Sequence, residues 1–116
     1  MKFSGMTIGV PTEIMPGERR VSSTPETVKK MVDEGATVLV QAGAGEGAFF
    51  SDDQYKAAGA TIIERAKDIF DKADVILKVK EPLFNEKEGM HESDMLRDGQ
   101  YLITFLHPRD REEDGG

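Results

Sequence analysis

The sequence predicts an α/β domain in which a mostly parallel, Rossmann-like (flavodoxin-like) sheet is covered by helices on both faces. Short segments with strand character alternate along the chain with segments of helical character. Residues 37–41 (Thr-Val-Leu-Val-Gln) are apolar almost throughout, as expected for a strand covered on both faces. Strands that alternate with helices join into right-handed βαβ units and a parallel sheet. The five predicted strands are residues 6–10, 37–41, 60–63, 75–79 and 101–106.

The first half of the chain carries clear signals for the ends of its elements. Pro11 ends the first strand, and residues 12–22 show no hydrophobic period, which indicates a loop. A helix is predicted to begin at Thr24-Pro25, because a capping side chain is followed there by proline at the first helical position. Gly35 ends this helix, since glycine readily adopts the left-handed conformation that follows a helix.

Two further helices are predicted between the second and fourth strands. Residues 51–54 (Ser-Asp-Asp-Gln) form a capping box, which opens a short helix that Gly59 ends. Residues 65–72 form the next helix, with Ile69 and Phe70 facing inward. The alternation of strand and helix therefore continues to the fourth strand.

The last third of the chain is more polar. The fourth strand breaks off at Pro82, and residues 84–93 are expected to be a loop because they are polar. Residues 94–97 are expected to form a single helical turn. Residues 109–116 are almost wholly charged or glycine, which predicts a disordered tail.

Composition excludes several classes of function. The 22 acidic residues against 15 basic ones give a net charge of −7, so neither nucleic acid nor an anionic membrane is expected as the main partner. The absence of cysteine excludes disulfides, thiolate metal sites and cysteine nucleophiles, and two histidines exclude a multi-histidine metal centre. No apolar run approaches the roughly 20 residues of a membrane span. A cytoplasmic domain without membrane insertion is expected.

A glycine cluster over residues 43–48 (Gly-Ala-Gly-Glu-Gly-Ala) follows the second strand and admits two interpretations. It matches a dinucleotide fingerprint with alanine in third place, and Glu64 lies near the spacing of a ribose-binding acid. However, two phenylalanines separate the glycines from the next helix, which begins with Asp52 and Asp53, and these carboxylates would repel a diphosphate. The alternative interpretation is a tight turn that needs backbone freedom.

Three basic residues follow three different strands. Arg20, Lys80 and His107 could converge at one edge of the sheet, where ligands of parallel sheets bind. An arginine holds a carboxylate bidentately, a lysine adds a second positive charge, and a histidine moves protons near neutral pH. Together they suit a small carboxylic acid that undergoes acid–base chemistry at the neighbouring carbon. Each also has a simpler interpretation: a solvated loop residue, an exposed strand end and a structural histidine.

The residues also carry a family resemblance. Segments that match in order and spacing resemble the start of the alanine dehydrogenase and pyridine nucleotide transhydrogenase family, over roughly residues 6–108. The matching segments are Gly9-Val10-Pro11-Thr12-Glu13, Glu18-Arg19-Arg20-Val21, Thr24-Pro25, Gln41-Ala42-Gly43-Ala44-Gly45-Glu46-Gly47, Ala57-Ala58-Gly59-Ala60, Leu77-Lys78-Val79-Lys80-Glu81-Pro82, Gly99-Gln100 and Thr104-Phe105-Leu106-His107.

This resemblance implies an N-terminal, substrate-side domain over residues 1–108, with NAD or NADP bound by a second domain that this chain lacks. It implies that Arg20 holds the substrate carboxylate, that Lys80 binds the substrate and takes part in catalysis, and that His107 is catalytic. The implied substrate is pyruvate or L-alanine. The implied nucleotide fingerprint lies in the absent domain, so no cofactor-binding or metal-binding residue is expected in residues 43–48 or elsewhere in this chain.

The resemblance leaves the branch of the family open. Lys80 and His107 favour an amino-acid dehydrogenase, whereas residues 15–18 and the polar insertion over residues 84–93 resemble a transhydrogenase alpha-type hydride-transfer subunit. Because the charged tail stands where the family continues into its nucleotide-binding domain, and that domain holds the hydride carrier, the chain alone is expected to show no turnover. A non-catalytic binding module, a homo-oligomer, a complex with a separate nucleotide-binding domain and a truncated product remain as alternatives.

Overall fold

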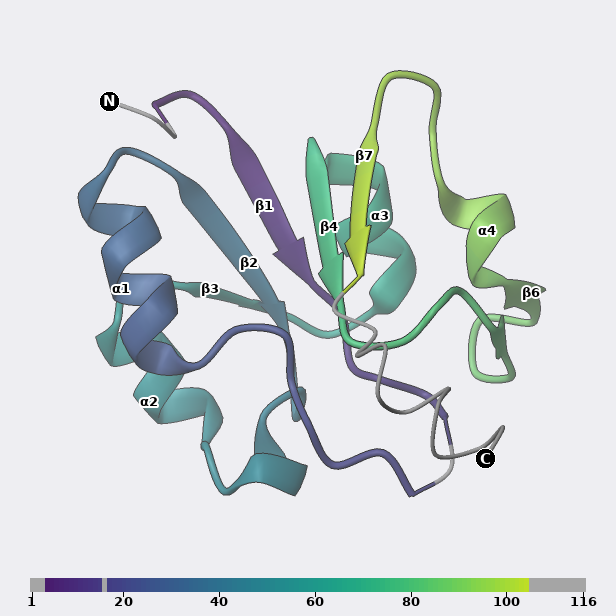
Figure 1. The fold of residues 1–116 in the computed structure, drawn as a ribbon, viewed down its shortest axis with the longest axis horizontal. Coiled ribbons are helices and arrows are strands. Elements are labelled where there is room, and N and C mark those ends of the chain that lie inside the picture. The colour runs from purple at the N-terminus through teal and green to yellow at the C-terminus, as the bar shows by residue number, and fades with distance from the viewer. Residues whose placement is uncertain (1–3, 16, 105–116) are drawn as a thin grey trace, which may run out of the picture.

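The computed structural model, which describes residues 4–15 and 17–104, contains a five-stranded parallel sheet in the order β3-β2-β1-β4-β7 (Figure 1). The chain builds the sheet outward from β1 through β2 to β3, then returns to the other side of β1 to add β4 and β7. The predicted α/β fold with a parallel sheet is confirmed. The strands of the sheet are β1 (Thr7–Val10), β2 (Thr37–Gln41), β3 (Thr61–Ile63), β4 (Val75–Lys78) and β7 (Tyr101–Thr104).

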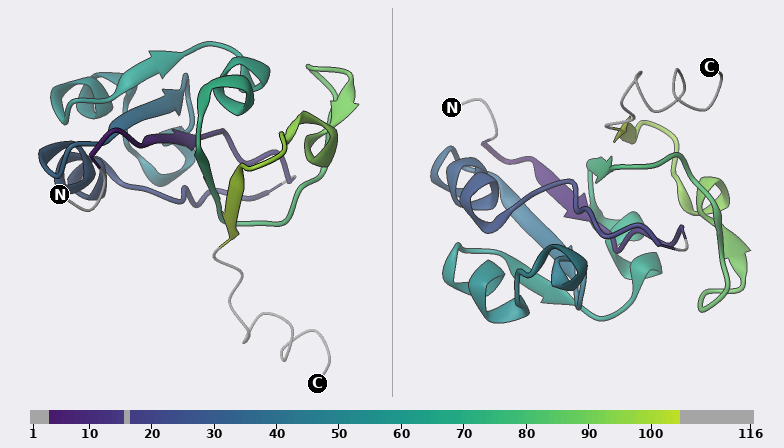
Figure 2. Two further views of the ribbon diagram at one scale, coloured as in Figure 1. Left: turned by 90° about the horizontal axis from the view of Figure 1, so that it is seen from above. Right: turned by 60° about the horizontal axis from the view of Figure 1, so that its bottom comes forward.

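Helices cover both faces of the sheet (Figure 2). One core cluster joins Val28 of α1 (Pro25–Asp33) and Tyr55 of α2 (Asp52–Ala57) to Val38 and Val40 of β2. A second cluster, on the opposite face, joins α3 (Ala66–Lys72) and α4 (Glu92–Met95) to Leu39 of β2 and Ile76 of β4. Successive residues of β2 thus enter different cores, which explains why this strand is apolar almost throughout.

Local sequence signals determine the ends of the first two helices. Thr24 caps α1 in a capping box with Thr27, and Ser51 caps α2 in the same way with Gln54, as the sequence predicted for the second helix. The glycine after each helix has positive φ, +100° at Gly35 and +104° at Gly59. The third helix ends differently, because later side chains donate to its last carbonyl groups: Arg97 and Gln100 both bond the oxygens of Phe70 and Ala73, at 2.6 to 3.2 Å.

Residues 84–93 correct one prediction. They were expected to form a loop, but β5 (Phe84–Asn85) and β6 (Met90–His91) pair as a short antiparallel hairpin, and α4 begins already at Glu92. The hairpin turn is closed by the Asn85 side chain, which accepts from the backbone N–H of Glu88 at 3.1 Å, and by a positive φ at Gly89. Its ordering depends on contacts with distant residues, which a polar composition does not reveal.

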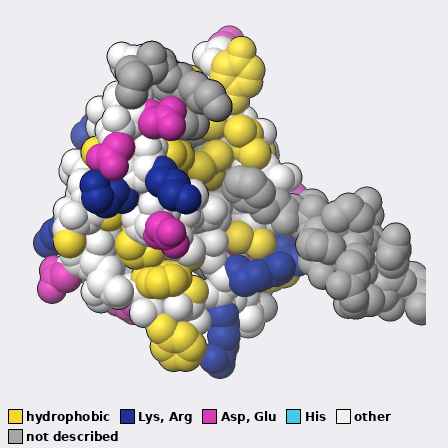
Figure 3. All heavy atoms as spheres, turned by 60° about the vertical axis from the view of Figure 1, so that its left-hand side comes forward, with side chains coloured by type: hydrophobic (Ala, Val, Ile, Leu, Met, Phe, Trp, Pro, Cys, Tyr) yellow, Lys and Arg dark blue, Asp and Glu magenta, His cyan; other side chains and the backbone are white. Residues whose placement is uncertain are grey.

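Surface charges of both signs are interspersed on the face shown in Figure 3. Elsewhere on the described surface, opposite charges pair at i,i+4 spacing along two helices: Lys29 with Asp33 at 3.0 Å on α1, and Lys67 with Asp71 at 3.1 Å on α3. Exposed pairs of this kind contribute little to stability. Among the described residues, none of the helices is long and apolar enough to cross a membrane.

Candidate site at the ends of the central strands

The strand order places a switch point between β1 and β4, where the two directions of chain progression meet. The segment that follows β1 carries Glu13, and the segment that follows β4 carries Lys80. These carboxyl ends lie side by side, because β1 and β4 pair in parallel at Ile8 with Val75 and at Gly9 with Ile76. A ligand of this domain is therefore expected beyond these ends.

Glu13 binds the end of β4 through three hydrogen bonds. Its carboxylate accepts from the Lys78 Nζ at 3.1 Å, from the Val79 N–H at 2.7 Å and from the Lys80 N–H at 3.2 Å. The Glu13 side chain is only 3% exposed and that of Lys78 is fully buried. One carboxylate thus joins the segments after β1 and β4.

A second buried carboxylate approaches the same ammonium group. Glu92, at the start of α4, lies with its Oε1 3.4 Å from the Lys78 Nζ, and both side chains are fully buried. This oxygen also accepts from the Leu83 N–H at 2.9 Å, while Oε2 has no hydrogen-bond partner among the described residues. Burial raises the pKa of Glu92, although Lys78 opposes the shift. Its carboxyl group therefore keeps its proton to a higher pH than an exposed glutamate.

Arg20 and Lys80 come together around the carboxylate of Glu18. The Arg20 guanidinium donates to Glu18 from Nε at 2.9 Å and from Nη2 at 3.0 Å, and the Arg20 backbone N–H adds a bond of 2.8 Å. These hydrogen bonds lower the pKa of Glu18, and the positive charge of Lys80 lowers it further. Arg20 thus binds a carboxylate on which the charge of Lys80 also acts. The third predicted site residue, His107, lies outside the described residues, as do residues 109–116 of the predicted tail.

The glycine cluster has the geometry of a tight turn. Gly43 has φ +81°, and its N–H donates to the Asp52 Oδ1 at 2.9 Å, so the carboxylate at the start of α2 occupies this amide. Gly47 lies against the backbone of the loop that carries Arg19 and Arg20, called here the arginine loop. A Cβ added to Gly47 would come within 2.9 Å of the Cα and carbonyl oxygen of Arg19. A short 3₁₀ helix (Glu46–Ala48) includes Gly47, and residues 49–51 separate it from α2. These contacts favour the tight-turn interpretation.

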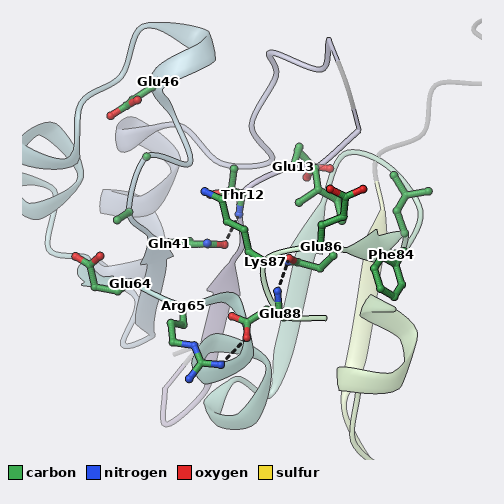
Figure 4. A pocket seen from close by; sticks show the side chains of 15 residues that line it. Thr12, Glu13, Gln41, Glu46, Glu64, Arg65, Phe84, Glu86, Lys87 and Glu88 are labelled. Atoms are coloured by element: carbon green, nitrogen blue, oxygen red, sulfur yellow. Dashed lines mark hydrogen bonds and ion pairs between the residues drawn. The ribbon is translucent and has the colours of Figure 1, made fainter. Parts of the chain in front are cut away.

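A cleft opens beyond β1, β2 and β3, at the edge of the sheet where the sequence predicted a ligand, but its lining residues were not predicted (Figure 4). Its volume is about 920 Å³, and the 84–88 turn forms one wall. Arg65 points across this wall to Glu88 at 2.6 Å, and this hydrogen bond lowers the pKa of Glu88. Deeper in the cleft, the Thr12 N–H donates to the Gln41 side chain at 2.9 Å. Arg20 and Lys80 do not line this cleft.

Comparison with known proteins identifies the family. A family model described as "Alanine dehydrogenase/PNT, N-terminal domain" matches residues 9–114. The chain belongs to this family. The alanine dehydrogenase of Methanococcus maripaludis is 46% identical over 102 residues, which are 88% of this chain and 26% of that protein. An NAD(P) transhydrogenase alpha subunit of Rhodospirillum rubrum is 45% identical over 101 residues, or 87% of this chain and 26% of that protein.

Solved structures of both branches share the fold of this alanine dehydrogenase/PNT N-terminal domain. An L-alanine dehydrogenase superimposes with a TM-score of 0.73 and 35% identity, over 93% of this chain and 28% of that one. A transhydrogenase from Sinorhizobium meliloti gives a TM-score of 0.70 and 31% identity, over 92% of this chain and 30% of that one. The resemblance read from the sequence is confirmed, and the chain spans about a quarter of the length of the curated relatives it matches.

The buried residues Glu13, Lys78 and Glu92 were missed as members of the site. One signal was available in the sequence, because Lys78 stands at the end of an otherwise apolar strand. A lysine inside such a strand needs a buried anionic partner. Nothing in the local sequence, however, indicates which carboxylates supply it, since Glu13 and Lys78 are 65 positions apart.

Proposed function

We propose that this chain is the substrate-binding domain of an NAD(P)-dependent oxidoreductase of the alanine dehydrogenase type. The observation that carries the proposal is that the Arg20 guanidinium binds a carboxylate through two hydrogen bonds, and the charge of Lys80 acts on the same carboxylate. Glu18 supplies this carboxylate within the chain. Its two oxygens show the fork geometry in which an arginine binds a small carboxylic acid.

In this proposal the ligand is pyruvate or L-alanine. Arg20 binds the ligand carboxylate, and Lys80 binds and polarises an oxygen of the carboxylate or the carbonyl group. His107 exchanges a proton with the substrate. Positive groups fixed beside a developing negative charge lower a barrier by several kcal/mol in a water-poor site.

The hydride carrier is NAD or NADP, which supplies or accepts the hydride when a second domain holds it. The tight contacts of the glycine turn with Asp52 and with the arginine loop support the view that residues 43–48 do not hold the nucleotide. We therefore propose that the 116-residue chain alone shows no turnover. NAD reduction with L-alanine by the pure chain would contradict this.

An NMR titration of the chain tests the proposal. Pyruvate is expected to shift the amide signals near Arg20, Lys80 and His107, and Arg20→Ala is expected to abolish these shifts, whereas Arg19→Ala serves as the matched control. Methyl pyruvate, which has no carboxylate, is expected to cause no clustered shifts. Shifts caused by NADH around residues 43–48, or a response to methyl pyruvate equal to that to pyruvate, would overturn the assignment.

A transhydrogenase role is the second candidate, because the relative from that branch is nearly as similar as the alanine dehydrogenase. In that case the chain contributes to hydride transfer between nucleotides within a larger assembly, either a homo-oligomer or a complex with a separate nucleotide-binding domain. Mixing the chain with such a domain separates the two roles. Hydride transfer that depends on L-alanine supports the first role, and transfer between nucleotides without an amino acid supports the second.

A further inference from the structure

The most unusual charged group outside the proposed ligand contacts is the carboxylate of Glu13. It lies in the interior between the segments that follow β1 and β4, and all three of its hydrogen bonds go to consecutive residues, 78 to 80. Two of the three donors are backbone N–H groups. A carboxylate that binds backbone amides fixes the path of the chain, whereas one that binds only a side chain does not.

The bond to the Lys80 N–H matters for the proposed ligand site. Lys78 is the last residue of β4, so the chain leaves this strand at Val79 and Lys80. At this point the Glu13 oxygens accept hydrogen bonds from the backbone, at 2.7 Å from the Val79 nitrogen and 3.2 Å from the Lys80 nitrogen. The direction in which the Lys80 side chain leaves the backbone is set by these two bonds.

The ammonium group of Lys78 makes this arrangement possible. A buried carboxylate without a counter-charge is costly, and Lys78 provides one at 3.1 Å from Glu13. Lys78 in turn lies 3.4 Å from Glu92, which belongs to α4 and bonds the Leu83 N–H before the hairpin. Glu92 therefore helps to hold Lys78 without touching the backbone at Val79 or Lys80.

We propose that Glu13 is a positioning residue for the carboxylate site: its oxygens fix the backbone at Val79 and Lys80 and thereby aim Lys80 at the ligand. This inference rests on the proposed function in one respect, since the ligand that Lys80 meets is the one proposed above. The geometry itself can be tested without any ligand.

A double-mutant cycle measures whether Glu13 acts through Lys80. In the otherwise unchanged 116-residue chain, Lys80→Ala is expected to raise the Kd of pyruvate about tenfold, because it removes a charged hydrogen-bond donor. In a background that carries Glu13→Met and Lys78→Met together, which has no acceptor at position 13, Lys80→Ala is expected to change the Kd less than about twofold. The paired background avoids an unpaired buried ammonium group, and Glu92, whose pKa burial already raises, can take up a proton once Lys78 is gone. Circular dichroism of each background checks that the fold is kept. Equal effects of Lys80→Ala in both backgrounds would overturn the proposal.

Glu92→Gln is the matched control. It neutralises the other carboxylate of the same buried cluster but leaves both Glu13 bonds to the backbone in place. The effect of Lys80→Ala is expected to stay about tenfold in this background. If Glu92→Gln removed the effect as fully as the Glu13 change, the buried cluster would act only by stabilising the fold, and the positioning role would be refuted.

Hydrogen exchange of the Val79 and Lys80 amides separates this inference from the proposed function. Both amides are expected to exchange at least about tenfold faster in the paired Glu13→Met, Lys78→Met variant, and at the original rate in Glu92→Gln. If the unchanged chain gives no response to pyruvate, the proposed ligand is wrong, but faster exchange still supports the positioning of Lys80. Unchanged exchange at both amides would overturn it whatever pyruvate does.

Discussion

Tyr55 offers a test of the packing that supports the arginine loop. Its hydroxyl group donates to the carbonyl oxygen of Ser23 at 2.7 Å, and the ring is fully buried beneath Gly45. Burial raises the pKa of Tyr55 to about 12 from its ordinary value of 10.0, with a further contribution from the negative charge of Asp52. The folded chain therefore strongly favours the neutral phenol.

The size and sign of the effect follow from this pKa. A tenfold change in an equilibrium constant corresponds to about 1.4 kcal/mol, so a rise from 10.0 to about 12 is worth about 3 kcal/mol. Because the folded-state pKa lies above the unfolded-state pKa, this stabilisation is complete below pH 10 and is lost as the pH rises towards 12. Tyr55→Phe is expected to lower the free energy of unfolding by about 1–3 kcal/mol at neutral pH, because the buried carbonyl group of Ser23 loses its donor.

The assay uses the absorbance of tyrosinate near 295 nm, with no tryptophan in the chain to interfere. The chain has only two tyrosines, and Tyr101 is 70% exposed, so Tyr101→Phe leaves Tyr55 as the single chromophore. Its titration midpoint is expected near pH 12, with circular dichroism recorded at each pH to detect unfolding. The free energy of unfolding, measured with urea, is expected to fall above pH 10 in Tyr101→Phe. In Tyr55→Phe the contribution of the Tyr55 phenol to this fall is expected to be absent. A midpoint near pH 10 in the folded Tyr101→Phe chain would refute the reasoning.

Two glycine substitutions test close approaches elsewhere in the fold. Gly9→Ala places a Cβ 2.5 Å from the Ile69 Cγ2 in the core under α3. The free energy of unfolding, measured with urea, is expected to fall by about 1–3 kcal/mol. An unchanged value would show that α3 can shift without cost. Gly47→Ala pushes on the backbone of Arg19 at 2.9 Å, so it is expected to weaken the NMR response to pyruvate at Arg20. The control is Gly5→Ala, before β1, where a φ of +78° strains any side chain but no atom lies within 4 Å of an added Cβ; it is expected to weaken the response less. Equal responses in the two variants would contradict the role of Gly47 in supporting the arginine loop.

Much of the fold could be predicted because its signals are local. The capping residues Thr24 and Ser51, with the glycines that follow each helix, lie within a few positions of the ends they determine. The apolar run of β2 likewise reports its burial on both faces. The hairpin over residues 84–91 could not be predicted in this way, because Arg65 and the Lys67 N–H hold its turn through Glu88, from more than 20 positions away.

The candidate site also has a part that the sequence predicted and a part that it did not. The rule that parallel strands end at one edge predicts that Arg20 and Lys80 lie near one another, and in the structure the charge of Lys80 acts on the carboxylate that Arg20 binds. The pairing of Glu13 with Lys78 did not follow, because the rule places residues at an edge without saying which are drawn into the interior. Burial of a charged pair depends on the exact facing of side chains in the folded sheet.

The strand order also has a consequence for the synthesis of the chain. The central strand β1 pairs first with β2, which lies about 30 positions later, but its other edge stays uncovered until β4 emerges nearly 70 positions after it. Until then the nascent chain presents an apolar strand edge, the feature by which partly folded chains associate. The same event buries Glu13 against the end of β4, so the contact that holds Lys80 and the protection of this edge are completed together.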